Sequence, residues 1–216
     1  MSDFQPYHLD TLWEAELQFW RGFTPRDWSK RGSTDALNHL TALNYSFIES
    51  IRRPPDAPLP PEIGTLNEMQ AWRAAQPTTR DGPQALTEYE ASMFQVRDAV
   101  AGLPLEHPVY LTLLTARGWR TLRFALEFVY SYSYLHFAHS HSVRDQWLPG
   151  IPQRMTQIAV DFFREYFSPA FGEASLTLEQ LVKRGAALTF TDTARGSGDT
   201  VWPPMLRGST PPPDFR

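Results

Sequence analysis

The stretch that decides the fold is residues 109–142, which read VYLTLLTARGWRTLRFALEFVYSYSYLHFAHSHS. It is the longest apolar and aromatic run in the chain, and it carries only four formally charged side chains. These are Arg117, Arg120, Arg123 and Glu127. Their spacing places them on one stripe of a helix, with aliphatic and aromatic residues around the rest of its surface. We therefore predict a long hydrophobic central helix that is enclosed by its neighbours and kinked near Gly118, with two helices that meet near Gly118 as the alternative.

Apolar residues recur at helical spacing on both sides of this run. Capping-box spacings at Thr11, Thr65 and Thr87 predict the starts of three helices, and a fourth helix is expected over about 34–52. Further helices are expected after Pro152 and over about 176–184. The sequence thus predicts a mostly α fold, an irregular bundle of about seven or eight helices around the central one.

Proline marks the expected boundaries. PPDAPLPP at 54–61 predicts a stiff connector between sub-bundles at 1–53 and 62–194, which together make a helical domain over 1–194. Alternating apolar and threonine residues near 187–193 predict one strand of a small C-terminal β-hairpin. The remaining residues, 195–216, are expected to form a turn, a short strand and an extended proline-rich arm.

Charge and composition argue against several classes of protein, although nucleic-acid binding through the arginine stripe stays a weaker third hypothesis. Twenty basic and 24 acidic side chains give a net charge of −4, which does not build the positive field of a nucleic-acid binder. Charges inside the central run argue against a membrane span. The first residues resemble no secretory signal, so we expect a cytoplasmic protein or one within a virion-like assembly. The absence of cysteine excludes disulfides, thiolate catalysis and cysteine-ligated metals.

His136 and His139 are the candidate catalytic or metal-ligating residues. They lie one helical turn apart, a spacing that suits two ligands of one metal ion or an acid and a base. The Glu-x-x-His and His-Glu-x-x-His signatures are absent, however. Two histidines alone do not make a metal site, and packing at the end of a buried helix explains them equally well.

Arg117, Arg120 and Arg123 are the candidate anion-binding residues. A stripe of guanidinium groups suits a phosphate or a carboxylate. The alternative is a solvated polar edge on an otherwise buried helix.

Large aromatic side chains outside the main helices are the candidate partner-binding residues, because rings that one core cannot absorb often anchor interfaces. They are Trp28, Trp72, Trp147, Trp202 and Phe215. The proline-rich arm would order on a partner or pack back on its own domain.

The sequence leaves two functional hypotheses. The first is a non-catalytic accessory, adaptor or structural subunit of a larger assembly, which binds a protein partner or further copies of itself and needs no cofactor. The second is an α-helical enzyme that uses His136 and His139, with a histidine-ligated metal or haem or as acid and base. Missing catalytic signatures favour the first.

Overall fold

The computed structural model describes residues 4–29, 33–54, 56–64, 66–113, 116–140 and 153–166. Within this part of the chain, seven helices and one two-stranded antiparallel sheet follow one another. They are α1 (Pro6–Arg21), α2 (Pro25–Trp28), α3 (Ser33–Arg52), α4 (Leu66–Ala75), α5 (Gly82–Val100), β1 (Pro108–Leu111), β2 (Gly118–Thr121), α6 (Leu122–Ser140) and α7 (Gln153–Tyr166). The predicted mostly α fold is confirmed.

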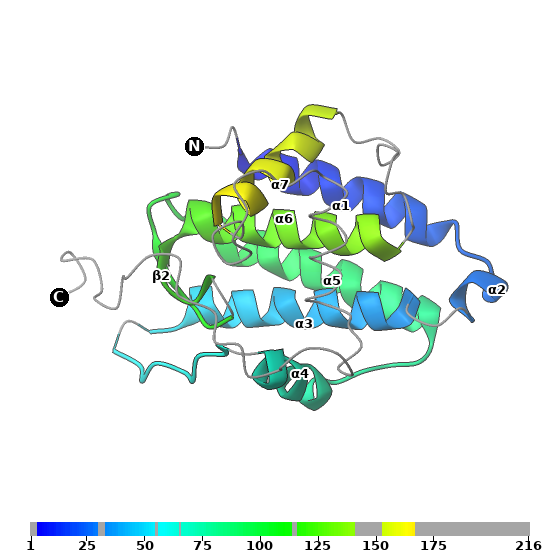
Figure 1. Ribbon diagram of the computed structural model, residues 1–216, viewed down its shortest axis with the longest axis horizontal. Coiled ribbons are helices and arrows are strands. Elements are labelled where there is room, and N and C mark those ends of the chain that lie inside the picture. The colour runs from blue at the N-terminus through cyan, green and yellow to red at the C-terminus, as the bar shows by residue number, and fades with distance from the viewer. Residues whose placement is uncertain are drawn as a thin grey trace.

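Four long helices, α1, α3, α5 and α6, pack side by side as a bundle (Figure 1). α1 and α6 run in one direction, and α3 and α5 run in the other. Because α3 and α5 are parallel and are successive long helices of the bundle, the chain must travel the length of the bundle between the end of α3 and the start of α5. Residues 53–81, which include α4, make this return and pass along the outer side of α3. We call them the return segment.

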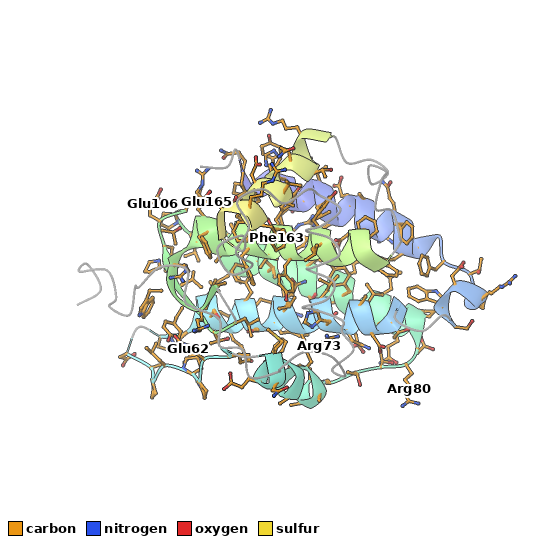
Figure 2. The ribbon with its side chains drawn as sticks, viewed as in Figure 1. Glu62, Arg73, Arg80, Glu106, Phe163 and Glu165 are labelled. Atoms are coloured by element: carbon orange, nitrogen blue, oxygen red, sulfur yellow. The ribbon has the colours of Figure 1, made fainter. Side chains whose placement is uncertain are left out.

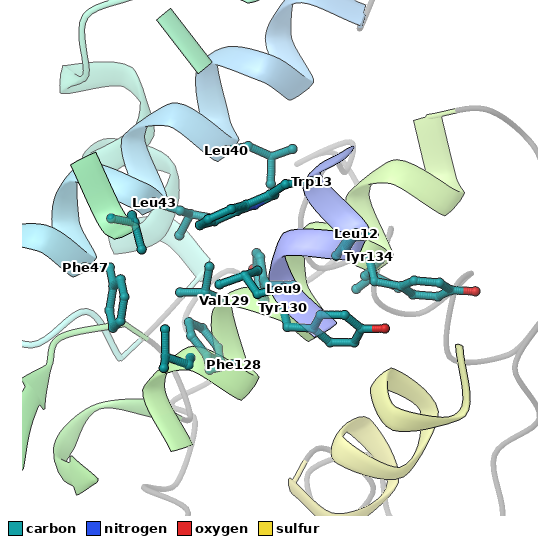
Figure 3. Close-up of a cluster of buried hydrophobic side chains, with 14 of the residues drawn as sticks. Leu9, Leu12, Trp13, Leu40, Leu43, Phe47, Phe128, Val129, Tyr130 and Tyr134 are labelled. Atoms are coloured by element: carbon teal, nitrogen blue, oxygen red, sulfur yellow. The ribbon is translucent and has the colours of Figure 1, made fainter. Parts of the chain in front are cut away.

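The core is one cluster of buried side chains contributed by the four long helices, the hairpin and α7. Trp13 of α1, which is 1% exposed, lies at its centre among Leu40 of α3 and Val129 of α6 (Figure 3). α7 adds Ile158 and Phe162 from a strongly amphipathic helix packed on α6. The apolar spacings that predicted α3 and α7 therefore describe faces that the structure buries.

Two helices begin earlier than their capping-box spacings predict. α1 begins at Pro6, and Gln5 caps it by donating its backbone N–H to His8 Nδ1 at 3.0 Å, one turn before Thr11. α5 begins at Gly82, where the Asp81 carboxylate accepts the backbone N–H of Gln84 at 2.8 Å, ahead of Thr87. Proline in the first turn starts both helices, and this signal outweighs the threonine boxes.

The prediction of one kinked helix over 109–142 is wrong in its first third. Residues 108–111 and 118–121 form the hairpin, in the register Pro108↔Thr121 and Tyr110↔Trp119, and only then does α6 begin. Gly118 has φ 101°, a left-handed conformation that a helix does not contain. Val, Tyr, Thr and Trp in this stretch favour strand over helix, because branched and aromatic side chains fit a pleated surface.

The hairpin also holds the part of the return segment that precedes α4. The backbone N–H of Ile63 donates to the Thr112 carbonyl at 2.7 Å, and Ile63 forms an isolated parallel bridge with Leu113. Beside it, the Tyr110 hydroxyl donates to Glu62 at 2.5 Å. The connector predicted at 54–61 is thus fastened to β1 at its far end.

The predicted C-terminal helix at 176–184, the hairpin near 187–202 and the arm at 195–216 lie outside the described residues. In the part of the chain that the structure covers, we find no helix that is long and apolar enough to cross a membrane.

Trp28, expected outside the main helices, lies in the short helix α2. Its ring stacks on Trp20 with centroids 5.8 Å apart and planes inclined by 15°. The ring also covers Gly82, where an added Cβ would lie 2.3 Å from the Trp28 ring. Gly82 thus lets α2 dock on the first turn of α5.

We expect Gly82→Ala to lower the free energy of unfolding by about 1–3 kcal/mol, because the new methyl group overlaps the Trp28 ring. Chemical denaturation measures this cost. In a Trp28→Ala background the same change should cost far less, since the clash is gone. An equal cost in both backgrounds would contradict this account of Gly82.

A buried polar layer crosses the bundle between α1, α3 and α5. The Tyr89 hydroxyl donates to Glu16 Oε2 at 2.5 Å, and both side chains are fully buried. Asn44 donates to the Ser92 hydroxyl at 2.9 Å, and Ser92 donates to the Tyr89 carbonyl at 2.7 Å. Burial raises the pKa of Glu16 to about 8, against the smaller lowering effect of the Tyr89 hydrogen bond. Glu16 is therefore mainly protonated at neutral pH.

The raised pKa predicts how stability depends on pH. Between the ordinary pKa of 4.5 and about 8, the unfolded chain has lost the Glu16 proton while the folded chain retains it. Raising the pH through this window opposes folding, by up to about 1.4 kcal/mol per pH unit. Glu16→Gln should remove this loss, and Glu14→Gln, an exposed change on the same helix, should retain it. Denaturation at a series of pH values is the measurement, and equal slopes in both variants would exclude Glu16 as the cause.

Candidate functional site

A pocket of about 270 Å³ opens between α3 and the return segment. It combines charged, polar and small apolar side chains from α3, from α4 and from the residues just after α4. They are Asp35, Asn38, His39, Ala42, Arg73, Ala74, Gln76 and Thr78. We call it the α3–α4 pocket. It exists because the return segment crosses the outer side of α3 instead of joining the bundle.

The α3 side of the pocket is one helical face, because Asp35, Asn38, His39 and Ala42 recur at spacings of three and four. Asn38 holds the rim in place. Its Nδ2 donates to the Thr79 carbonyl at 2.8 Å, and its Oδ1 accepts the Thr79 backbone N–H at 3.3 Å. This pair of bonds fastens the end of the return segment to α3.

His39 forms the inner wall. Its side chain is buried, and its ring lies 6.3 Å from the Trp72 ring and 6.2 Å from the Tyr132 ring of α6, measured between centroids. Burial, and then the positive charge of Arg73, lower the pKa of His39 well below its ordinary value. The imidazole is therefore neutral at pH 7 and can accept a hydrogen bond or a proton.

Arg73 supplies the positive charge. Figure 2 shows it on α4, between that helix and α3, whereas Arg80 extends away from the loop beyond α4. Burial lowers the pKa of the half-buried Arg73, while nearby Tyr132 and Asp35 raise it. Because a guanidinium stays protonated in proteins, Arg73 contributes a fixed positive charge to the lining of the pocket.

Asp35 supplies the negative charge at the mouth. It is exposed, it lies in the first turn of α3, and within the described residues it forms no ion pair. Asp35 and Arg73 both line the pocket, and the Asp35 charge raises the pKa of Arg73. With His39 neutral, the charges of the described side chains that line the α3–α4 pocket sum to zero.

The predicted anion-binding arginines do not lie on one helix, which corrects the stripe inferred from their spacing. Arg117 precedes β2 and pairs with Glu62, with Nε and Oε2 3.2 Å apart. Arg120 is in β2 and donates to the carbonyls of Trp119 and Arg117, each at 2.7 Å. Arg123, on α6, donates to the Phe4 carbonyl at 3.1 Å. All three bind acceptors of the chain itself, and anion binding by them stays a prediction.

His136 and His139 lie on α6 as expected, but the positions of their side chains are outside what the structure describes. Among the side chains that it does describe, no group of three His, Asp or Glu could hold a metal ion. A metal, haem or acid-base role for the two histidines stays a prediction.

Of the five predicted partner-binding aromatic residues, two lie in the part of the chain that the structure describes. Trp28 and Trp72 are half-buried, the first on Trp20 and the second beside His39, so both contribute to packing within the chain. Trp147, Trp202 and Phe215 lie outside the described residues.

Sequence reasoning missed Asp35, His39 and Arg73. One local signal was present, since Asp35 and His39 are four residues apart on a helix that the sequence predicts correctly. Arg73 comes from another helix, and only the path of the return segment brings it to them. The chain matches no protein-family model, no curated protein and no solved structure. The geometry of the α3–α4 pocket is therefore the basis for a functional proposal.

Proposed function

We propose that the protein binds a small molecule with an acidic group in the α3–α4 pocket, where Arg73 holds that group. The observation that carries the proposal is a half-buried guanidinium beside a neutral, buried imidazole at a pocket open to solvent. A carboxylate or phosphate bound there would accept charge-assisted hydrogen bonds from Arg73. Partial burial of the cation strengthens such bonds, because less water competes for them.

The pocket also limits the size of the ligand. A volume of about 270 Å³ lies at the lower end for small-molecule sites, so it suits a compact metabolite better than a large cofactor. Ala42 and Ala74 leave this space open, and Asn38 fixes the rim before a ligand arrives. A site formed in advance loses little free energy to ordering when it binds.

We expect Arg73→Gln to weaken ligand binding by roughly ten- to hundredfold, the loss typical for a hydrogen bond to a charged group. Thermal shift with a panel of acetate, succinate, inorganic phosphate and the free amino acids measures binding. Arg80→Gln is the matched control, because Arg80 is exposed and outside the pocket. The proposal fails if no member of the panel stabilises the protein, or if both variants respond as the wild type does.

A second candidate function is that of a structural subunit that assembles with further copies of itself, in the cytoplasm or within a virion-like assembly. The observation in its favour is Phe94 on α5, which is 52% exposed and lies 5.4 Å from the Arg97 guanidinium. A large ring beside an arginine on a helix surface is typical of interface anchors.

If Phe94 anchors such an assembly, Phe94→Ser should reduce the mass measured by light scattering to that of a monomer. Leu59→Ser, which changes an exposed apolar residue of the return segment, should leave the mass unchanged. A wild-type protein that is monomeric at high concentration would contradict this second function.

A further inference from the structure

We infer that the ligand of the α3–α4 pocket is a zwitterion of the free amino-acid type, with its carboxylate on Arg73 and its ammonium group on Asp35. The inference rests on the binding function proposed above and adds the chemical class of the ligand. It depends on Asp35, the second charged side chain of the pocket, because a ligand that is only an acid would have no use for this carboxylate.

The sum of charges distinguishes a zwitterion from a simple acid. Among the described residues that line the pocket, Arg73 and Asp35 carry opposite charges and His39 is neutral, so these charges sum to zero. A simple anion bound to Arg73 would also face the Asp35 carboxylate, which repels it. A zwitterion pairs with both groups and leaves the occupied pocket neutral.

The separation of the two side chains supports the same class of ligand. Asp35 raises the pKa of Arg73 through space, yet it forms no ion pair in the described part of the chain. Opposite charges that face one pocket from different helices, without direct contact, leave room for a molecule that carries the complementary pair. An α-amino acid has its two charges on neighbouring carbon atoms, which suits a pocket of about 270 Å³.

The helix dipole offers a competing explanation for why Asp35 and Arg73 are present, because each charge suits the helix end on which it lies. Asp35 is in the first turn of α3 and Arg73 is in the last turn of α4, where the helix dipole favours an acid and a base respectively. A role limited to the helix dipole would change stability but not the choice between ligands. Ligand preference therefore separates the two explanations.

The test compares three forms of one molecule by calorimetry. Each of the twenty free amino acids is screened, and the tightest is then measured beside its N-acetyl derivative, an anion, and its amide, a cation. We expect the wild type to bind the zwitterion about fivefold or more tightly than either derivative, the gain of one partly exposed charge pair.

Two variants then assign the charges. Asp35→Asn should weaken binding of the zwitterion about fivefold and leave the affinity for the N-acetyl form unchanged or higher. Arg73→Gln should weaken binding of the zwitterion and of the N-acetyl form but leave the affinity for the amide unchanged. Glu49→Gln, an exposed acid on α3 outside the pocket, is the control, and circular dichroism checks that each variant folds.

Equal affinity for the zwitterion and its N-acetyl form, or a preference that Asp35→Asn leaves intact, would overturn the inference and spare the binding function. If acetate, succinate or phosphate binds through Arg73 and no free amino acid does, the inference is likewise wrong. If nothing with an acidic group binds, the proposed function itself fails.

Discussion

The parallel packing of α3 and α5 is the constraint on which the rest of the structure depends. Two successive helices of a bundle can be antiparallel with a short turn between them, but parallel neighbours require a long connection. Here that connection is the return segment, whose helix lies outside the bundle. The four long helices bury a common core, and the return segment adds a second, thinner layer over α3. The α3–α4 pocket lies between the two layers.

The two layers differ in chemistry. The bundle is filled with aromatic and aliphatic side chains, and its buried carboxyl, Glu16, is neutral and hydrogen-bonded to Tyr89. The interface with the return segment contains a full positive charge, a full negative charge and a buried, neutral imidazole. A fold can therefore carry a polar site at modest cost when the site lies outside its main core, since charges there keep part of their hydration.

Sequence periodicity predicted the helices well where one face is apolar and the other polar, as in α3 and α7. It failed at residues 109–121, where the spacing of Arg117 and Arg120 fits a helical stripe while the apolar residues before them fit a buried helix and a buried strand alike. The deciding feature there is the positive φ of Gly118, which a sequence shows only as a glycine. The burial of Glu16 could have been predicted, because Glu16 follows Leu9 by seven residues and Leu12 by four and so lies on the buried stripe of α1. The pocket could not have been predicted, because only the path of the return segment brings Arg73 of α4 close to Asp35 and His39 of α3.

The return segment is fastened at two points, to the hairpin through Ile63 and to α3 through the bonds between Asn38 and Thr79. Between these points α4 is a span anchored at both ends, and it contributes the buried Met69 to the hydrophobic core. The shape of the α3–α4 pocket is therefore set by where the chain is fastened on either side of α4. A change at either fastening would alter the pocket and leave the core of the four long helices as it is.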